Sequence, residues 1–385
     1  MSKYPMVKLG DVCIIERGGS PRPIDKYMTK NPHGINWIKI GDAPIDSMYI
    51  TKAAEKIIPE GVSKSRKVKK GDFILSNSMS FGRPYILDID GCIHDGWLLI
   101  RDANGVFEKQ FLYYYLSSET VHAKLKQMAV GGVVNNLNSN KVRSLMIPVL
   151  RKEEQVKICE KLNKITTIIQ YRKQQLIKLD ELAKSRFIEM FGRCGEDKFG
   201  WGLKTLEDCC VINPQKTTDN RLKPGLEVSF CPMPYVSEKG EIKTDDITIY
   251  DKVKTGFTYF AENDVLFAKI TPCMENGKGA IARNLKNEIG FGSTEFHVLR
   301  PKKEMITPEW LYFLTTFQQF RKDAETNMTG SAGQRRVPAN FLKKYRVSVP
   351  PKSLQYKFAR ILQQLDKSKF RMKKCLKLLS YIRHL

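Results

Sequence analysis

The sequence predicts an α/β protein with two pseudo-symmetric α/β domains, separated by two long helices packed as a coiled coil. Three observations carry this prediction: a length of 385 residues, an internal repeat, and a heptad pattern that closes each copy of the repeat. A chain of this length exceeds one ordinary core, and 42% hydrophobic residues are typical of a globular protein. We place the α/β domains at residues 1–150 and 196–350, and the helical spacers at residues 151–195 and 351–385.

The repeat begins near the start of each domain. Leu9 and Asp11 in VKLGDVCII (7–15) match Leu206 and Asp208 in LKTLEDCCVI (203–212), at a distance of 197 positions. The later matching segments lie 199 or 200 positions apart: FLYYYL (111–116) with WLYFLT (310–315), AVGGVVNN (129–136) with MTGSAGQRR (328–336), and SLMIPV (144–149) with YRVSVPP (345–351). These segments predict, in each copy, a helix, a small-residue loop and a short strand.

Each copy then continues into a helix with an apolar seam. The seam residues follow one another in steps of four and three, which is the heptad spacing of a coiled coil. In the first copy they are Ile158, Leu162, Ile165, Ile169, Arg172, Leu176, Leu179 and Ala183. In the second copy, 200 positions later, they are Phe358, Leu362, Leu365, Lys369, Met372, Leu376, Leu379 and Arg383.

We expect the two helices to pack on each other, although each could instead be an amphipathic surface helix of its own domain. The first helix, at about 33 residues, would be ~50 Å long and would hold the two α/β domains apart. Arg172 and Lys369 interrupt the seam, and they are either solvated or in contact with a partner.

The charge of the chain indicates a polyanionic partner. The formal net charge is +24, which favours nucleic acid or an anionic membrane. No apolar run reaches the ~18 residues that a membrane helix needs, and MSKYPMVKLG lacks the apolar stretch of a signal peptide. Nine Cys without a C-x-x-C pair favour the reducing cytoplasm. The excess of basic residues in both helical spacers fits a rod over a phosphate backbone, or one docking onto acidic partner subunits.

Polar and basic residues gather in loops of both domains, where they predict contacts with double-stranded DNA. Arg can bond guanine, Asn and Gln can bond adenine, and Lys and Ser suit phosphates. In the first domain the candidates are Lys64, Arg66, Lys67, Ser76, Asn77, Arg83, Asn135, Asn136 and Lys141. In the second they are Lys269, Thr271, Asn276, Lys278, Ser293, Thr294, Ser331, Gln334, Arg335 and Arg336. Each loop could also be a plain hydrophilic surface. Glu275 could accept from a cytosine amino group or orient Lys278.

The residues of the common DNA-processing chemistries do not occur together. An adenine methyltransferase would need an N-P-P-Y type tetrapeptide, and the GK at 277–278 lacks the spacing of a phosphate loop. Cys273 could be a nucleophile only with a placed His, and His297 lies on a predicted strand. We therefore predict no catalytic residue, no metal ligand and no cofactor in this chain. The alternatives are a stand-alone DNA-processing enzyme with an unrecognised site, or a non-specific basic scaffold.

Several long runs resemble the specificity (S) subunit of type I restriction-modification systems. The runs in the second half are YFAENDVLFAKITPCMENGKGAI (259–281), GFGSTEFHVLRP (290–301), MTGSAGQRRVP (328–338) and VSVPPKSLQ (347–355). The first half is similar more loosely, through VKLGDV, GGSPRP (18–23), WIKIGD (37–42), KGDFILSNS (70–78) and IPVLRKEEQ (147–155).

This resemblance implies two target recognition domains and two helical conserved regions. Each recognition domain would read one half of a split DNA site, and the helices would set the gap and dock two modification subunits. Those subunits would bind S-adenosylmethionine and methylate adenine, and restriction subunits would use ATP and magnesium to cleave unmodified DNA in phage defence. The S subunit itself would be non-catalytic.

Overall fold

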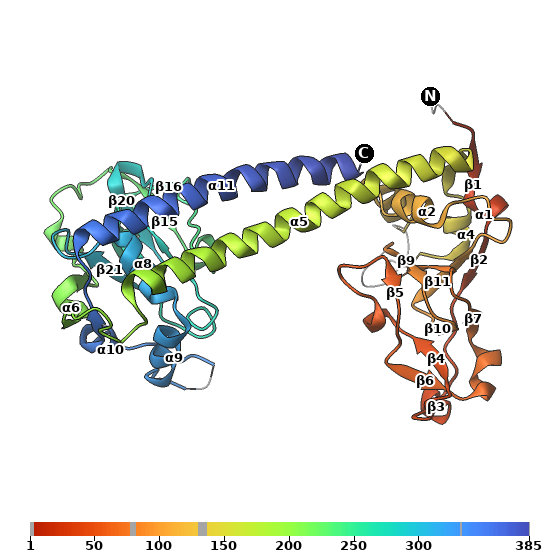
Figure 1. Cartoon of the computed structure of the whole chain (residues 1–385), viewed down its shortest axis with the longest axis horizontal. Helices are drawn as coiled ribbons and strands as arrows, with labels where there is room; N and C mark the ends of the chain where they lie inside the picture. Colours follow the sequence, from red (N-terminus) through yellow and green to blue (C-terminus); the bar gives the residue numbers. More distant parts are fainter. Residues whose placement is uncertain (1–3, 78–81, 130–136, 332, 385) are drawn as a thin grey trace. The chain divides into compact units, whose positions relative to one another are not determined.

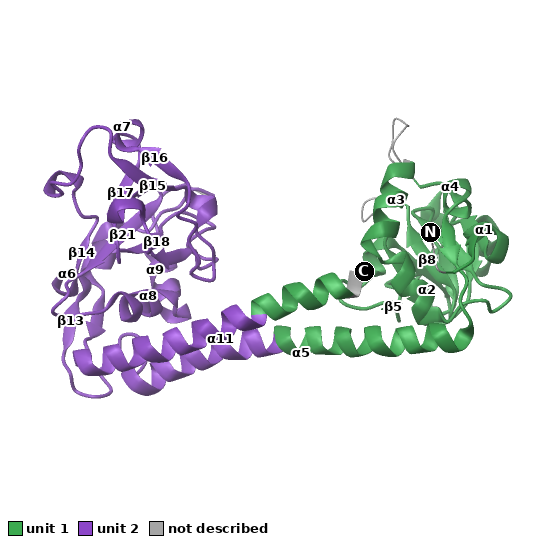
Figure 2. Ribbon diagram, turned by 90° about the horizontal axis from the view of Figure 1, so that it is seen from above, with its two compact units in different colours: residues 1–173, 373–385 green, residues 174–372 purple. Residues whose placement is uncertain are grey.

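The structure, a computed structural model, describes residues 4–77, 82–129, 137–331 and 333–384 (Figure 1). The chain forms two compact units, and each long helix is shared between them (Figure 2). The first unit contains residues 1–173 and 373–385, and the second contains residues 174–372. No helix in the described ranges is long and apolar enough to cross a membrane.

The first unit combines short strands with helices near its two ends. In chain order its elements are β1 (Met6–Lys8), α1 (Leu9–Val12), β2 (Ile14–Arg17), η1 (Ile24–Lys26), β3 (Met28–Thr29), β4 (Ile35–Ile38), η2 (Ile40–Asp42), β5 (Tyr49–Ile50), β6 (Glu55–Ile57), η3 (Pro59–Lys64), β7 (Arg66–Val68), β8 (Phe73–Ser76), β9 (Pro84–Leu87), β10 (Gly91–Ile93), β11 (Trp97–Arg101), α2 (Lys109–Leu116), α3 (Glu119–Ala129), α4 (Ser139–Arg143), β12 (Met146–Pro148) and the start of α5 (Lys152–Phe191). Its described strands form the sheets β2-β11-β8-β9-β5, β3-β6-β4-β10-β7 and β1-β12.

The second unit repeats this order with fewer strands. Its elements after α5 are β13 (Leu203–Thr205), α6 (Leu206–Cys209), β14 (Cys210–Ile212), η4 (Lys216–Thr218), β15 (Glu227–Cys231), η5 (Met233–Tyr235), β16 (Ile247–Ile249), α7 (Tyr250–Val253), β17 (Thr258–Ala261), β18 (Val265–Ala268), β19 (Gly279–Ile281), η6 (Lys286–Glu288), β20 (Ile289–Gly292), β21 (Phe296–Pro301), α8 (Pro308–Thr316), α9 (Gln318–Thr326), α10 (Ala339–Lys344), β22 (Arg346–Ser348) and α11 (Lys352–His384). Its described strands form the sheets β14-β21-β18-β19, β16-β15-β20-β17 and β13-β22.

The predicted α/β repeat is confirmed by the pairing of these strands. In both units the N-terminal strand pairs antiparallel with the strand before the long helix, as β1 with β12 and β13 with β22. A parallel pair inside a mixed sheet is also shared, β4 with β10 and β15 with β20, and the first unit has a further parallel pair, β5 with β9. The two units therefore share one topology, and β3 and β5 are additions of the first.

Alternation along the central strands divides each unit into layers. In β8, Phe73 and Leu75 pack with the helices α2 and α3, whereas Ile74 packs with the other sheet. In β18, Phe267 joins the core beneath α8 while Leu266 joins the core of the other sheet. Successive side chains of a strand point to opposite faces, so a strand covered on both sides reads as a continuous apolar run.

A buried glutamine at the start of each long helix ties that helix to its own domain. Gln155 donates from Nε2 to the carbonyl oxygens of Val106 (3.1 Å) and Leu150 (2.8 Å). Its Oε1 accepts from the backbone N–H of Glu108 at 2.6 Å. The fully buried amide thus satisfies three main-chain groups of the loops around it.

Gln355 does the same in the second unit. It donates to the carbonyl oxygens of Met305 (3.0 Å) and Pro350 (2.8 Å), and accepts from the N–H of Thr307 at 2.8 Å. All four residues lie 199 or 200 positions after their counterparts in the first unit, so the repeat extends to single hydrogen bonds.

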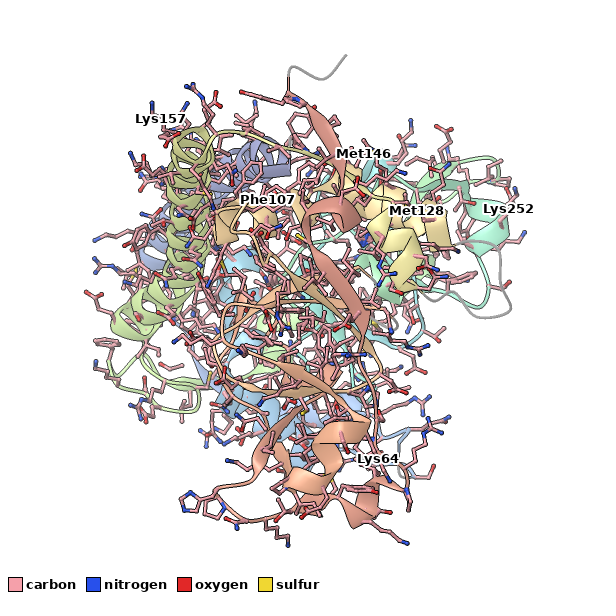
Figure 3. The ribbon with its side chains drawn as sticks, turned by 90° about the vertical axis from the view of Figure 1, so that its right-hand side faces the viewer. Lys64, Phe107, Met128, Met146, Lys157 and Lys252 are labelled. Carbon is pink, nitrogen blue, oxygen red and sulfur yellow. The ribbon has the colours of Figure 1, made fainter. Side chains whose placement is uncertain are left out.

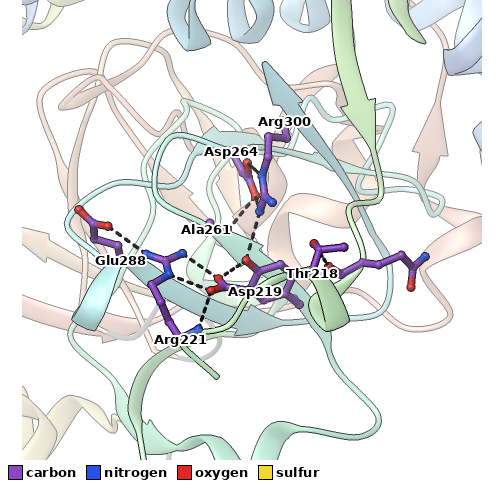
Figure 4. Close-up of polar contacts among 9 residues, drawn as sticks. Thr218, Asp219, Arg221, Ala261, Asp264, Glu288 and Arg300 are labelled. Carbon is purple, nitrogen blue, oxygen red and sulfur yellow. Dashed lines mark hydrogen bonds and ion pairs between the residues drawn. The ribbon is translucent and has the colours of Figure 1, made fainter. Parts of the chain in front are cut away.

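A forked ion pair is also repeated. Asp72 accepts from Arg101 at 2.8 and 2.5 Å, and Asp264 accepts from Arg300 at 2.8 and 2.7 Å. In the second unit the Asp264–Arg300 pair lies beside the bonds of Asp219 with Arg221 (Figure 4). Because a fork fixes the relative position of two side chains, these pairs hold β11 and β21 against neighbouring turns.

The two long helices pack against each other within the second unit, where segments far apart in the sequence lie side by side (Figure 2). Phe187 of α5 meets Phe358 of α11 at 5.4 Å between ring centroids, and Leu362 and Leu365 belong to the same core. Each predicted seam residue with a described side chain is buried or half-buried. The coiled-coil prediction is therefore confirmed. At 40 residues α5 is longer than expected, because it continues beyond Ala183 to Phe191.

The basic interruption at Lys369 has a partner in the neighbouring helix. Its Nζ lies 2.6 Å from a carboxylate oxygen of Asp180 in α5 and 3.7 Å from Asp366 in α11. The ammonium group thus stays at the edge of the seam instead of entering it. Arg172, the other interruption, is half-buried.

Candidate nucleic-acid interface

The loop between β18 and β19 is folded by its own main chain. The N–H groups of Met274, Asn276 and Lys278 donate to the carbonyl oxygens of Ile270, Pro272 and Cys273, each at 3.0 Å. These bonds form successive tight turns, so the segment 270–278 has a defined shape. It presents Thr271, Asn276 and Lys278 together, as the sequence predicted for one polar loop.

A buried cation holds this loop from below. Arg321 of α9 donates to the carbonyl oxygens of Met274 (2.5 Å), Gly277 (3.3 Å) and Thr315 (2.7 Å). Its guanidinium also lies 4.7 Å from the ring centroid of Phe267. Burial lowers the pKa of Arg321 to about 10, so the side chain remains charged at neutral pH. The contacts of Arg321 close the C-terminal end of the loop much as a helix cap would.

Three loops of the second unit meet at Lys269. The Lys269 N–H donates to the carbonyl of Glu295 at 2.9 Å, and its carbonyl accepts from the Val337 N–H at 2.9 Å. Next to it, the Thr271 N–H donates to the Arg335 carbonyl at 3.0 Å. These bonds join segments 269–278, 293–296 and 328–337, which contain every candidate residue predicted for the second domain.

Two neighbouring arginines in this site have different surroundings. Arg336 forms a fork with the carboxylate of Glu295, with Nε and Nη2 each within 2.9 Å of an oxygen, and Nη1 donates to the Gln334 carbonyl at 3.0 Å. The Arg336 guanidinium lowers the pKa of Glu295. Arg335 has looser contacts, at 4.0 Å to Glu275 and 3.8 Å to Glu325. Arg336 therefore braces the loop, and Arg335 keeps its donors available.

The other candidates of the second domain lie at the surface of this site. Thr294, Asn276, Ser331 and Gln334 are exposed, and Lys269, Thr271, Lys278 and Ser293 are half-buried. Thr271 donates its hydroxyl proton to Glu275 Oε1 at 2.7 Å, whereas Glu275 Oε2 is buried with no hydrogen-bond partner among the described residues. Lys278 is directed to the carbonyl of Met233 at 3.5 Å. Glu275 thus orients Thr271, and Lys278 is held by a main-chain oxygen.

His297 lies under the site, and both of its ring nitrogens have neighbours. Nε2 donates to the Val337 carbonyl at 2.8 Å, and Nδ1 is 3.0 Å from the amide of Asn213. Burial lowers the pKa of His297, which favours the neutral ring at neutral pH. The His297 ring thus connects the segments that contain Val337 and Asn213.

In the first unit the equivalent position is Asn77. Its N–H donates to the Gly96 carbonyl at 3.0 Å and its carbonyl accepts from the Leu137 N–H at 3.3 Å, the same pattern as at Lys269. The Asn77 side chain is buried and donates to the Asp95 carbonyl at 2.8 Å. Ser76 is also buried, and its hydroxyl accepts from the Arg83 N–H at 3.0 Å. The expectation of surface contacts for Ser76 and Asn77 thus differs from their placement, because both fasten the turn on which they lie.

The remaining first-domain candidates do not form one cluster. Lys64 and Lys67 are exposed, and Lys64 lies at the end of the unit away from Met146 (Figure 3). Arg66 lies 3.3 Å from Glu16, and Arg83 stacks on Tyr85 and donates to the Ile45 carbonyl. Lys141 is half-buried on α4. Asn135 and Asn136 lie outside the described residues.

Polar residues that the sequence analysis did not select surround Asn77. They are Arg17 at the end of β2, Ser20 and Arg22 in the loop that follows, and His94 and Asp95 in the loop before β11. The signal that could have found them is GGSPRP (18–23), which contains two of the five. His94 and Asp95 can be recognised as candidates only when β11 and β21 are aligned, with Trp97 at the position of Phe296.

A family model described as the type I restriction modification DNA specificity domain matches this chain twice, over residues 1–181 and 199–379. The chain belongs to this family. The two matches correspond to the two structural repeats, each with its α/β part and its long helix. The S-subunit resemblance inferred from the sequence is therefore confirmed.

Two specificity subunits from Escherichia coli are similar to part of the chain. The type I restriction enzyme EcoEI specificity subunit is 38% identical over 173 residues, which is 44% of this chain and 28% of that protein. The EcoAI specificity subunit is 42% identical over 153 residues, which is 40% of this chain and 26% of that protein. The matched region thus spans little more than a quarter of each relative.

A solved structure shows the same fold over the whole chain. It concerns complex assembly and conformational transition of the type I R-M system, and it matches with a TM-score of 0.67 and 18% identity. The match covers 100% of this chain and 97% of the other. Both units of this chain therefore have a counterpart of the same fold in that structure.

Proposed function

We propose that this chain is the DNA-reading subunit of a type I restriction-modification complex and that each unit binds one part of a split duplex site. The observation that carries the proposal is the double family match, which covers both repeats. A net charge of +24 supports a polyanionic ligand, because contacts with phosphates supply much of the affinity for DNA. Such a complex would act on DNA in the cytoplasm.

In the second unit, the joined loops 269–278, 293–296 and 328–337 form the DNA-reading site. Asn276 and Gln334 offer amide groups, which suit adenine, and Lys269 and Lys278 suit phosphates. Arg335 is the base-reading arginine, because its ion pairs are long and exchangeable. Arg336 supports the site by holding Glu295, because its Nε and Nη2 groups already donate to that carboxylate.

The helices α5 and α11 dock two modification subunits, which are methyltransferases. Outside the buried seam both helices keep large apolar side chains at the surface, and such side chains favour a protein partner. They are Val156, Ile168, Tyr171, Ile177, Leu182 and Ile188 on α5, and Tyr356, Phe370, Leu378, Tyr381 and Ile382 on α11. S-adenosylmethionine, ATP and magnesium would be bound by the modification and restriction subunits.

The proposal is tested by reconstituting the complex with its modification subunits and mapping adenine methylation on random-sequence duplexes. We expect one split motif, and neither methylation nor cleavage from this chain alone with methyl donor or metal. Binding without sequence preference would instead identify a basic scaffold. Activity from the isolated chain would identify an enzyme.

The two arginines give a sharper test of the second-unit site. Arg335→Ala should cost ~1–3 kcal/mol at the specific site and relax the motif at one position of one half. Arg336→Ala and Glu295→Gln should resemble each other, because both break the same fork. If Arg336→Ala relaxed the motif at one base position and Arg335→Ala did not, then Arg336 would be the base-reading arginine and Arg335 would not.

A further inference from the structure

A carboxylate next to the central strand organises basic residues in both units. In the second unit, Glu295 immediately precedes β21 and holds Arg336. In the first unit, Asp95 lies two residues before β11. The two loops are equivalent because Asn77 bonds to Gly96 as Lys269 bonds to Glu295, so Asp95 lies one residue before the position that Glu295 occupies. A site in the second unit therefore has a structural counterpart around Asp95.

Four residues converge on Asp95. The Ser20 hydroxyl donates to Oδ1 at 2.9 Å, His94 Nε2 lies 2.9 Å from Oδ1, and Arg22 lies 3.8 Å from Oδ2. Arg17 donates from Nε to the Asp95 carbonyl at 3.4 Å. We call these five residues the Asp95 cluster: Arg17, Ser20, Arg22, His94 and Asp95. The Gly96 N–H donates to His94 Nδ1 at 2.9 Å, so Nε2 carries the proton and donates to the carboxylate.

The loop after β2, which carries Ser20 and Arg22, is fixed at its base. The Gly18 N–H donates to the Trp97 carbonyl at 2.9 Å, and the Gly19 N–H donates to the Ile93 carbonyl at 3.2 Å. A Cβ at Gly18 would lie 2.1 Å from the His94 carbonyl oxygen, so only glycine allows this approach. Ser65 adds a bond to the Gly19 carbonyl at 2.8 Å and connects the loop to the predicted basic segment 63–70.

The two arginines of the cluster are exposed, the other three residues are half-buried, and the cluster carries more positive than negative charge. The Arg22 side chain is 84% exposed and Arg17 is also exposed, with Asp95 as the one carboxylate among the five. An ion pair of 3.8 Å at such a surface contributes little to folding. The ion pair therefore adds little to the stability of the fold, and the side chains of Arg17 and Arg22 stay exposed to solvent.

We propose that the Asp95 cluster is a phosphate-binding site for duplex DNA in the first unit. Arg17 and Arg22 contact the backbone phosphates, and Asp95 is a positioning residue that orients Arg22, Ser20 and His94. Arginine donors at the end of β2 and in the loop that follows it suit phosphate oxygens and carry no base information. The inference rests on the proposed DNA-reading function and adds residues to it.

The positioning role of Asp95 predicts that removing its negative charge lowers the affinity for DNA. A carboxylate near a phosphate repels it, so by charge alone Asp95→Asn should raise DNA affinity. If Asp95 positions the arginine and the hydroxyl, the same change lowers affinity at every salt concentration. The sign thus separates a positioning carboxylate from a bystander.

The experiment uses the reconstituted complex with duplexes that contain or lack its site, titrated between 50 and 200 mM salt. Arg17→Ala and Arg22→Ala should each reduce the slope of log K against log salt by about 1, weaken both duplexes alike, and leave the methylated motif unchanged. Lys8→Ala is the matched control, because Lys8 is an exposed cation paired in β1 with Met146, away from Lys64. Its slope should equal that of the wild type.

Unchanged slopes in both arginine variants, or higher affinity in Asp95→Asn, would overturn the inference while the wild-type complex still binds its site. A wild-type complex without any site preference would instead refute the proposed function itself.

Discussion

The two units share their internal supports and differ at their loops. Gln155 and Gln355 make the same three hydrogen bonds, and Asp72–Arg101 is repeated as Asp264–Arg300. The positions near the sites differ instead. By the repeat alignment, buried Arg321 corresponds to exposed His122, buried His297 to Leu98, and Lys269 to Asn77. The bonds that hold the long helices and the central strands are therefore kept between the units, whereas the side chains that support the candidate loops differ.

The largest expected effect tests the shared part of this comparison. Gln155→Ala and Gln355→Ala should each lower the free energy of unfolding of their own unit by about 3 kcal/mol, because three buried main-chain groups lose partners. Hydrogen exchange measured by mass spectrometry on the full chain gives the stability of each unit. If the losses in free energy of unfolding differed by more than ~1 kcal/mol, the two glutamines would have the same hydrogen-bond geometry but different contributions to stability.

A smaller effect should be confined to one unit. Arg321→Met should destabilise the second unit by about 2 kcal/mol, since the unpaired carbonyls are partly offset by removal of a buried charge. Protection of amides 270–278 should fall most. His122→Met in the first unit is the matched control and should change stability by less than ~0.5 kcal/mol. Unaltered exchange in 270–278 would show that the loop holds its shape without Arg321.

The smallest effect depends on pH. Burial lowers the pKa of His297, so the unfolded chain binds this proton more readily than the folded one. The stability of the second unit should therefore fall as pH drops below about 6.5, with a slope of at most ~1.4 kcal/mol per pH unit. His297→Leu, which places the first unit's residue there, should remove this dependence. A dependence that persists in the variant would place the titration on another group.

The repeated parts of the fold were predictable because the same segments recur in the amino-acid sequence. Leu9 and Leu206 mark the same helix start, and the steps of four and three marked the seam from Ile158 to Ala183. The spacer bounds 151–195 include the end of α5 at Phe191, where Gly192 follows with a φ of 82°. The expected length of about 33 residues was too short, because Phe187 and Phe191 continue the packing beyond Ala183. Lys369 looked like an interruption, and its partner Asp180 lies on the other helix, where spacing gives no signal.

The loop sites were only partly predictable. Composition identified 269–278 and 328–336 as polar loops, and the structure joins them through Lys269 and Thr271. The sequence did not show that Arg336, and not Arg335, is paired with Glu295. Glu295 lies 41 positions before Arg336, and no local pattern links the two residues. Asp95 and Arg22 were missed for the same reason, since a side-chain cluster built from distant loops exists only after the strands have paired.

The closure of the loop 270–278 has a kinetic consequence. Its turns are completed by main-chain bonds and by Arg321, so its conformational entropy is lost when the chain folds and not when a ligand arrives. A preformed surface of this kind should associate with correct and incorrect sequences at similar rates. Discrimination by this unit would then appear as residence time, with matched DNA leaving slowly and mismatched DNA leaving fast.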